Sequence, residues 1–579
     1  MKRDINRLKS IRLTNFRCFK QLQEINFKPI TLIYGQNSSG KSSIIKSLQW
    51  IQKMSSPGWE LEFNRLVHQH EPDTAIEISY AVEMADESDL YPTSARGYSI
   101  LWQLRKELRR SEITLKVGPT TALPAMAEGG AMTKILEKLN SGVVDDGRAK
   151  ILSLQLVVNG SHLASIRRMI GLLDRSSDSI RNTTFLELTD INSAHPFMAD
   201  ILRHAKNTSI ANARESLAML DSIFHHSTVP SSHSNASLLS KCQDYILQLE
   251  AVSLEDISPA DIGNALLESE YQAPTLPFRH QRSNRDFVQK HDGFDGGISV
   301  SLRNLPVNDS RPGDISPKEE ILRLFKSMFG SVIEMLTAPG AQNLHTDPIA
   351  GSIHIPPLRS RPEKPFLLTK EGLAQAGVRD WPCANKRAME AINQWLRSLD
   401  RSDTGYELTY DLVPNEDGAD VRFTGARDIK RNVRLQLNEI GAGFSQLIPV
   451  LLACYQHDES LIAIEQPELH LHPALQAELG DVFINEALGR HPDEMSANQF
   501  IIETHSEHIL LRILRRIRET SVGRETGKPA ITPDDVAVLY VENRGDHSVV
   551  YEMPVNHQGE LVRDWPGGFF EEGLRELLI

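Results

Sequence analysis

A glycine- and serine-rich stretch near the start of the sequence has the residue types of a phosphate-binding loop. It fits the pattern G-x-x-x-x-G-K-[ST], and the residues expected to contact phosphate are Gly35, Asn37, Ser38, Ser39, Gly40, Lys41, Ser42 and Ser43. In such a loop the glycines let backbone N–H groups close around the phosphates, the lysine adds a positive charge, and the hydroxyl after the lysine holds Mg²⁺. The sequence therefore predicts a site for a nucleoside triphosphate and its magnesium ion.

Two further motifs near the other end of the sequence carry the same chemistry. A Gly-x-Gly-x-Ser-Gln turn at 441–446 opens an apolar helix at 447–454, and a helix N-terminus of this kind is an anion site. The apolar run 461–464 then ends in Glu465, which is typical of a buried parallel strand that presents a Mg²⁺ ligand.

Further polar residues follow these motifs. Gln466 and Glu468 lie in a turn that leads into another helix, and the apolar run 500–502 predicts a further buried strand that leads to His505. Each motif alone is weak, but their order after a phosphate-binding loop strengthens the prediction of a nucleotide site.

The elements that position these residues alternate between strands and helices in both terminal segments, which predicts an α/β fold. We expect a lobe with the phosphate loop at 1–83 and a second lobe at 341–530 that carries the other motifs. Between them, 84–340 is expected to be an insertion, mostly helical with one hairpin, and 531–579 a short C-terminal domain.

Within the insertion, alternating residues around Asn159-Gly160 predict a hairpin at 152–166. The spacing of apolar residues predicts helices at 199–224, 237–252 and 312–336. Sustained heptads are absent from this sequence, so we expect no long coiled-coil arms.

Composition limits the class of protein. The net charge of −13 argues against a broadly basic DNA-binding surface, although local basic runs at 105–110 and 512–518 leave open a groove formed in a dimer. Four cysteines lie far apart, which argues against a zinc site or a disulfide framework. The sequence has no apolar run of about 18 residues and no apolar signal segment, so we expect a cytoplasmic protein that does not span a membrane.

Taken together, the motifs resemble those of ABC-type ATPases of the SMC/RecF/OLD-like, AAA-type branch. The opening 11–19 looks like the first strand and turn of those proteins, and 354–362 and 540–570 resemble segments of one prokaryotic group. That group is similar to the ATPases of anti-phage systems such as Septu, retron-associated systems and PARIS. The resemblance covers 1–80 and 351–579, and it implies an ABC/SMC-head-like P-loop ATPase split by the insertion, with ATP and Mg²⁺ as cofactors.

This resemblance also gives roles to individual residues. Arg17 would bind the nucleotide together with the phosphate loop. Gly443, Ser445 and Gln446 would form the signature that contacts the γ-phosphate of ATP held by another subunit. ATP would then join two protomers head to tail, as a homodimer or a higher even oligomer.

For the metal and the reaction centre, the resemblance points to four residues. Ser42 and Glu465 would hold Mg²⁺, and Gln69 would be a Q-loop contact to the metal or to water. His505 would be the switch histidine. Typical members have Asp-Glu where this chain has Glu465-Gln466, and a neutral Gln466 cannot accept a proton.

That departure leaves the mechanism of hydrolysis open. Glu468 could substitute as the general base, or the protein could hydrolyse ATP slowly and work mainly as an ATP-gated clamp. Gln466 could also orient the attacking water without deprotonating it, as a glutamine does in some GTPases. We expect slow but real ATP hydrolysis.

Two functions follow from the resemblance. The first is a sensor or regulator of a separate effector, a nuclease or toxin, in bacterial anti-phage defence. OLD proteins carry a Toprim nuclease after the ATPase, and too few residues follow Val541 to build one, so nuclease activity is expected from a partner. The alternative is a RecF-like repair ATPase that binds DNA directly. DNA or a phage component is a further expected partner, whereas a membrane is not.

Overall fold

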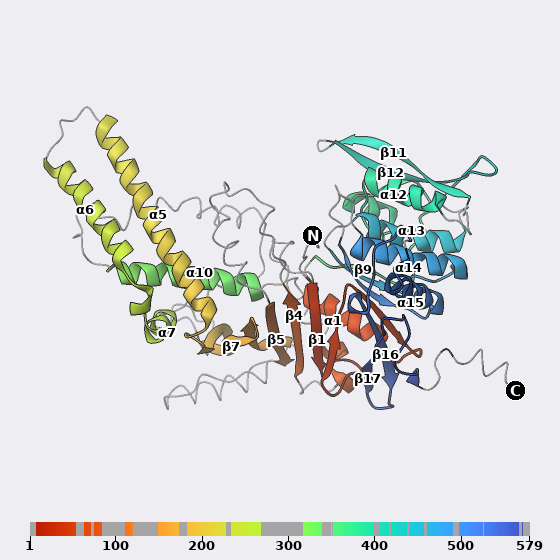
Figure 1. Cartoon of the computed structure of the whole chain (residues 1–579), viewed down its shortest axis with the longest axis horizontal. Helices are drawn as coiled ribbons and strands as arrows, with labels where there is room; N and C mark the ends of the chain where they lie inside the picture. The colour runs from red at the N-terminus through yellow and green to blue at the C-terminus, as the bar shows by residue number, and fades with distance from the viewer. Residues whose placement is uncertain are drawn as a thin grey trace. The chain divides into compact units, whose positions relative to one another are not determined.

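The computed structural model describes residues 7–53, 63–70, 75–83, 110–119, 149–172, 182–226, 233–267, 316–337, 349, 351–398, 405–415, 418–436, 439, 441–456, 460–489, 497–524, 526–566 and 570. The chain divides into two compact units, and Figure 1 labels several of their helices and strands. Unit 1 takes in residues 1–53, 62–83 and 342–579, and unit 2 takes in 54–61 and 84–341.

A six-stranded sheet lies at the centre of unit 1, in the order β17-β16-β3-β15-β14-β9. Its strands are β3 (Ile30–Gly35), β9 (Ile353–Ile355), β14 (Leu461–Glu465), β15 (Gln499–Glu503), β16 (Val536–Asn543) and β17 (Ser548–Glu552). Neighbouring strands are parallel except for β16 and β17. Because β3, β15 and β14 are adjacent and parallel, their carboxyl ends meet at one edge of the sheet. The predicted α/β fold is confirmed.

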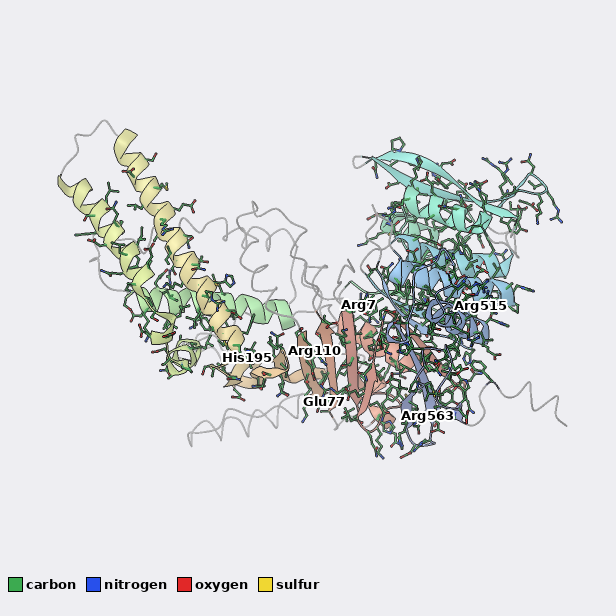
Figure 2. All side chains as sticks on the ribbon, in the orientation of Figure 1. Arg7, Glu77, Arg110, His195, Arg515 and Arg563 are labelled. Carbon is green, nitrogen blue, oxygen red and sulfur yellow. The ribbon has the colours of Figure 1, made fainter. Side chains whose placement is uncertain are left out.

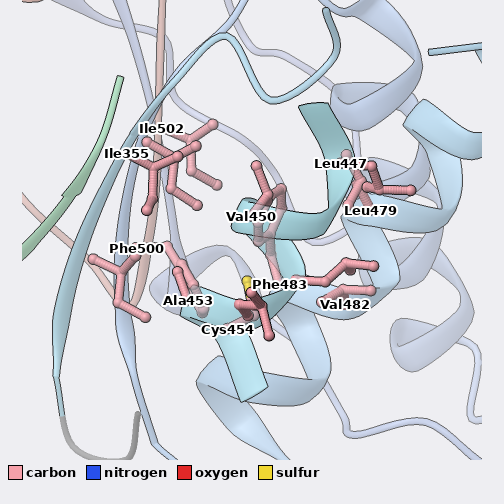
Figure 3. Close-up of a cluster of buried hydrophobic side chains, with 14 of the residues drawn as sticks. Ile355, Leu447, Val450, Ala453, Cys454, Leu479, Val482, Phe483, Phe500 and Ile502 are labelled. Atoms are coloured by element: carbon pink, nitrogen blue, oxygen red, sulfur yellow. The ribbon is translucent and has the colours of Figure 1, made fainter. Parts of the chain in front are cut away.

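Four helices cover this sheet, three of them directly after one of its strands and one directly before β14. They are α1 (Lys41–Lys53), α13 (Ala442–Gln456), α14 (Pro473–Leu488) and α15 (Glu507–Ser521). Figure 3 shows α13 packed through Val450 and Cys454 between sheet residues such as Phe500 and α14 residues such as Phe483. Each such side chain stabilises the fold by roughly 1.5–3 kcal/mol when fully buried. The sheet edge that carries the motifs is therefore held by a continuous apolar core.

The first residues of unit 1 form an antiparallel sheet, in the order β2-β1-β4. Its strands are β1 (Arg7–Thr14), β2 (Gln23–Asn26) and β4 (Ile76–Glu83), and α2 (Phe63–Leu66) and η2 (His68–His70) precede β4. Gln499 joins this sheet to the central one, because its side-chain amide donates to Leu8 O at 2.8 Å and accepts from Leu8 N at 2.9 Å.

A second antiparallel sheet in unit 1 consists of β10, β11, β12 and β13, with β12 between β10 and β11. These elements are β10 (Phe366–Leu367), β11 (Tyr406–Asn415), β12 (Gly418–Asp428) and β13 (Val433–Leu435), with helices α11 (Lys370–Ala376) and α12 (Lys386–Arg397). Phe366, Trp381 and Phe423 pack ring against ring and anchor this sheet to the core of unit 1.

Unit 2 has four long antiparallel strands and a set of helices. They are β5 (Arg110–Pro119), β6 (Ala149–Val158), β7 (Ser161–Leu172), β8 (Asn182–Ile191), α5 (Pro196–His226), α6 (His233–Ala251), η4 (Leu254–Asp256), α7 (Pro259–Leu267) and α10 (Pro317–Thr337). The hairpin expected around Asn159-Gly160 is β6–β7, with φ values of 51° and 82° at the turn. Strands β5 and β8 extend this hairpin on both sides and were not anticipated.

Residues 531–566, the start of the expected short C-terminal domain, lie in unit 1. These residues form η6 (Pro533–Asp535), β16 and β17, and β16 pairs with β3. Trp565 packs edge to face on Tyr34, at the end of β3. Among the described helices, none has the length and apolar character needed to cross a membrane.

Candidate functional site

The phosphate-binding loop joins β3 to α1 and holds its lysine in place. Lys41 is 4% exposed, and its Nζ donates to Gly35 O at 2.9 Å and to Gln36 O at 2.8 Å. Burial lowers the pKa of Lys41, and the nearby carboxylates of Glu503 and Glu468 oppose this shift. The ammonium is therefore held inside the loop that would receive a phosphate.

Two glycines allow this close packing. Gly35 has φ 147°, and a Cβ there would overlap with the carbonyl oxygen of Val541. Gly40 has φ 104°, and a Cβ there would overlap with the Sγ of Cys18. Any other residue at either position would shift the loop.

The remaining loop residues divide into an exposed tip and a buried base. Asn37 and Ser38 are exposed, with Ser38 in the left-handed region at φ 60°. Ser39 is fully buried, and its hydroxyl has no hydrogen-bond partner among the described residues. Arg17 lies beside the loop, because its Nε donates to Ser43 Oγ at 3.1 Å, and its contact with the nucleotide stays a prediction.

Two glutamates stand side by side at the ends of β14 and β15. Glu465 and Glu503 are register partners, and each is 5% exposed. Glu503 Oε2 accepts from Ser42 Oγ at 2.7 Å, and Glu465 Oε1 accepts from His354 Nε2 at 2.6 Å. The structure thus brings Ser42 to a pair of carboxylates.

The two carboxylates have opposite pKa shifts. Burial raises the pKa of Glu503, and the hydrogen bond from Ser42 only partly opposes it. Burial also acts on Glu465, but its hydrogen bond and attraction to His354 outweigh burial, so its pKa is lowered. Hard oxygens from one or two carboxylates and a hydroxyl are the protein ligands that Mg²⁺ uses beside nucleotide phosphates. The residues present fit that ion.

The turn after β14 is tied to the turn after β15. Gln466 has φ 47°, and its backbone N–H donates to Glu503 O at 2.7 Å. Glu468 accepts from His505 N at 2.7 Å with one oxygen and from Thr504 Oγ1 at 2.7 Å with the other. Burial raises the pKa of Glu468 although these hydrogen bonds oppose it. Both oxygens of Glu468 are engaged in positioning the segment that carries His505.

His505 is half-buried near Lys41. Burial lowers the pKa of His505, and the positive charge of Lys41 lowers it further. Its Nε2 is buried and has no hydrogen-bond partner among the described residues. A neutral imidazole with a vacant nitrogen can donate one hydrogen bond to a ligand.

The expected signature residues are engaged within the chain. Gln446 is 9% exposed, and its amide donates to Arg359 O at 2.8 Å and accepts from Arg359 N at 3.0 Å. Ser445 Oγ donates to Ala442 O at 2.8 Å. Gly443 packs so closely on His470 that a Cβ would overlap with the His470 carbonyl oxygen. Their expected contact with ATP on another subunit stays a prediction.

Gln69 is the expected metal contact that the structure does not bring to the carboxylate pair. It lies in η2 with φ 53° and an exposed side chain. No hydrogen bond joins it to Ser42 or Glu465 in the described part of the chain. Its neighbour His68 instead binds Arg17 O through Nδ1 at 2.8 Å, which holds this turn against the start of the chain.

Three residues of this site were not anticipated: His354, Arg359 and Glu503. Arg359 is 4% exposed, and its guanidinium donates to Glu465 O at 2.7 Å. Burial lowers the pKa of Arg359 to about 10, against the pull of Glu468, Asp380 and Glu465. Glu503 could have been found, because it ends an apolar strand as Glu465 does. His354 and Arg359 carried no such signal beyond their place in the 354–362 motif.

Comparisons with known proteins find ATPase-type domains in this chain. Residues 298–511 match a family described as an AAA domain, putative AbiEii toxin, Type IV TA system, and residues 10–107 match a second AAA domain family. Residues 531–578 match a family described only as a protein of unknown function. These matches confirm the resemblance to AAA-type ATPases.

One curated relative matches a short part of the chain. Endonuclease GajA from Bacillus cereus (strain HuB5-5) is 33% identical over 140 residues, which are 21% of this chain and 19% of the endonuclease. The chain thus matches about a fifth of that relative's length. The SMC head domain from Thermotoga maritima aligns with a TM-score of 0.33 and 10% identity, over 95% of this chain and 100% of that domain.

Proposed function

We propose that the chain binds ATP with Mg²⁺ at this site, hydrolyses it slowly, and dimerises around the nucleotide to control a separate effector in anti-phage defence. The observation that carries the proposal is Ser42, next to the loop lysine, held at 2.7 Å by Glu503 beside Glu465. A phosphate-binding loop and a carboxylate pair at one sheet edge suit a phosphate–metal ligand.

Slow hydrolysis is proposed from the side chains around the attacking position. Gln466 is neutral at the place where a carboxylate would act as the base. Glu468 already accepts hydrogen bonds from His505 and Thr504. To act as a base, Glu468 would have to give up one of the hydrogen bonds that hold Thr504 and His505 in place. We therefore expect low turnover.

Dimerisation around ATP is supported by the family resemblance and by the position of α13. The turn that carries Gly443 opens this helix, and Gly441 and Ala442 at its start are exposed. The backbone N–H groups of such a helix start can bind a phosphate presented by a second protomer. A ligand that binds only the joined state stabilises the dimer.

A defence role is proposed from the resemblance to the ATPases of anti-phage systems, and a link to a nuclease is supported by the match to GajA, which is named as an endonuclease. We assign cleavage to a partner nuclease or toxin and regulation to this chain. Direct DNA binding, as in a RecF-like protein, is less well supported because the arginines of α15 are already engaged. Arg512 and Arg516 pair with Asp481 at 2.6 Å, and Arg518 donates to Gln558 O at 3.0 Å.

Nucleotide binding and assembly test the core of this proposal together. Binding of a fluorescent ATP analogue and the mass of the particle with and without ATP should be measured for the wild type, Lys41→Ala and Lys53→Ala. Lys41→Ala is expected to lose both binding and assembly. Lys53, exposed at the far end of the same helix, controls for the loss of a positive charge. Normal binding and dimerisation by Lys41→Ala would show that the site is wrongly assigned.

The effector role needs a separate experiment. A tagged copy expressed from its native operon should bring down a stoichiometric partner with nuclease or toxin activity. Cleavage of DNA by the isolated chain would contradict this role. Salt-sensitive DNA binding by a lone ATP-dependent dimer would favour direct work on DNA.

A further inference from the structure

Glu503 occupies an unusual place for a carboxylate. It ends β15, directly opposite Ile33 on β3, two residues before the phosphate loop begins at Gly35. Its side chain is 5% exposed and lies among apolar strands. A buried carboxylate is costly unless charge or hydrogen bonds compensate it, so its position calls for a cationic partner.

The hydrogen bond between Ser42 and Glu503 fixes the orientation of the serine. A hydroxyl has one proton and two acceptor lone pairs. The proton of Ser42 points to Glu503 Oε2 at 2.7 Å, so its lone pairs point elsewhere and are available to a cation. An ionised carboxylate has no proton to donate, which makes this direction of the hydrogen bond the one allowed.

Glu465 stands beside Glu503 as its register partner. Two carboxylates at adjacent strand ends repel each other, and a divalent cation beside them would offset this repulsion. The neighbouring position on the β14 side carries the neutral Gln466. At this end of the central sheet, β14 therefore supplies one carboxylate, Glu465, and β15 supplies the second, Glu503.

We propose that Glu503 is part of the magnesium site: it orients the Ser42 hydroxyl toward the ion and, with Glu465, supplies the negative charge that retains it. This inference rests on the proposed function, because the metal is the one that accompanies ATP. It adds a residue of β15 to the site predicted from Ser42 and Glu465.

The experiment separates metal binding from nucleotide binding. Binding of a fluorescent ATP analogue to the full chain should be measured across Mg²⁺ concentrations and in EDTA, for the wild type, Glu503→Ala and Glu503→Gln. Loss of a group that orients a metal ligand typically weakens metal binding about 10–100-fold. For Glu503→Ala, we expect the Mg²⁺ concentration at half-saturation to rise about tenfold or more, with binding in EDTA not weakened.

Two further variants make the result specific. Glu503→Gln keeps an oxygen that accepts from Ser42 but loses the charge, so its Mg²⁺ requirement should lie between those of the wild type and Glu503→Ala. Glu552 also ends a strand but is exposed at the end of β17, so Glu552→Gln should behave as the wild type. Mn²⁺ resonance spectra of the nucleotide complex provide a second readout, and Glu503→Ala should release bound Mn²⁺.

Each outcome decides the matter. A wild-type Mg²⁺ requirement in both Glu503 variants would overturn the inference and leave ATP binding intact. Equal weakening in Mg²⁺ and in EDTA would show that Glu503 only supports the loop, which also overturns it. A wild-type protein that binds no nucleotide in either condition would instead contradict the proposed function.

Discussion

Glu468 Oε1 accepts a hydrogen bond from the backbone N–H of His505 at 2.7 Å, which joins the turn after β14 to the turn after β15. The second oxygen of Glu468 accepts from Thr504 Oγ1, also at 2.7 Å. A single carboxylate therefore fixes the position of the histidine next to the phosphate-binding loop. The imidazole Nε2 of His505 has no partner among the described residues, so a ring held in this position can form a hydrogen bond with a ligand.

Glu468→Ala should destabilise the protein, because it leaves the His505 N–H and the Thr504 hydroxyl buried without their acceptor. A buried polar group without a partner costs about 1–3 kcal/mol. Urea unfolding with and without ATP measures this cost. Glu468→Gln keeps one acceptor oxygen and should lose less. A Glu468→Ala protein as stable as the wild type, but with no ATP turnover, would instead favour a catalytic role for Glu468.

A pair of glycines at the start of α13 offers a matched test of packing. A Cβ at Gly443 would overlap with His470 O, whereas a Cβ at Gly441 would meet nothing within 4 Å. Overpacking of this kind costs about 1–3 kcal/mol. Gly443→Ala should therefore lower thermal stability and displace the turn that carries His470, while Gly441→Ala should leave stability unchanged. Equal effects of the two substitutions would contradict the close contact between α13 and this turn.

The strands of the central sheet could be predicted from local patterns. The site that they form could be predicted only in part. The apolar runs before Glu465 and Glu503 predict buried strands, since periodicity and length are local properties. Which strands lie side by side depends on contacts between distant residues, such as β16 against β3. For that reason the sequence alone could not show that β16 and β17 belong to the central sheet.

The same limit applies to single side chains. Gln446 fits an anion-binding turn by its sequence, yet its amide is bound to the backbone of Arg359, 87 residues away. His354 reaches Glu465 across 111 residues of sequence. No motif records such pairs, because each residue is of a common type and only the fold brings the partners together. Lys41 and Ser42 are predicted from the spacing within the loop motif, and Glu465 from the apolar run that it ends, because both signals are local.

Asp481 forms buried ion pairs with two arginines of α15, and its removal should destabilise the protein. It is 3% exposed and accepts from Arg512 Nη1 and Arg516 Nη2 at 2.6 Å each. Arg515, labelled in Figure 2, lies on the same helix and pairs with Glu519. Removing one partner of a buried ion pair leaves uncompensated charge and costs about 3–5 kcal/mol. Asp481→Ala should therefore lose stability in urea unfolding, by about 3 kcal/mol.

The pH dependence of Asp481 gives a second check. Burial acts to raise its pKa, but hydrogen bonds and attraction from Arg516 and Arg512 outweigh burial and lower it. A group with a depressed pKa in the folded state contributes stability above its ordinary value, here 3.8, and loses it as the pH falls further. Stability of the wild type should therefore fall more steeply below this pH than that of Asp481→Asn. Parallel pH profiles would contradict the ion-pair network.

Gln466→Glu tests the reason proposed for slow hydrolysis. This substitution returns a carboxylate to the position after Glu465, and general-base catalysis contributes typically 10²–10⁴-fold to a rate. We expect the turnover of saturating ATP to rise at least about tenfold, with little change in nucleotide affinity. Single-turnover measurements separate this chemical step from product release. Unchanged turnover, with Glu468→Gln then abolishing it, would assign the base to Glu468 and show that the neutral residue at position 466 does not limit the reaction.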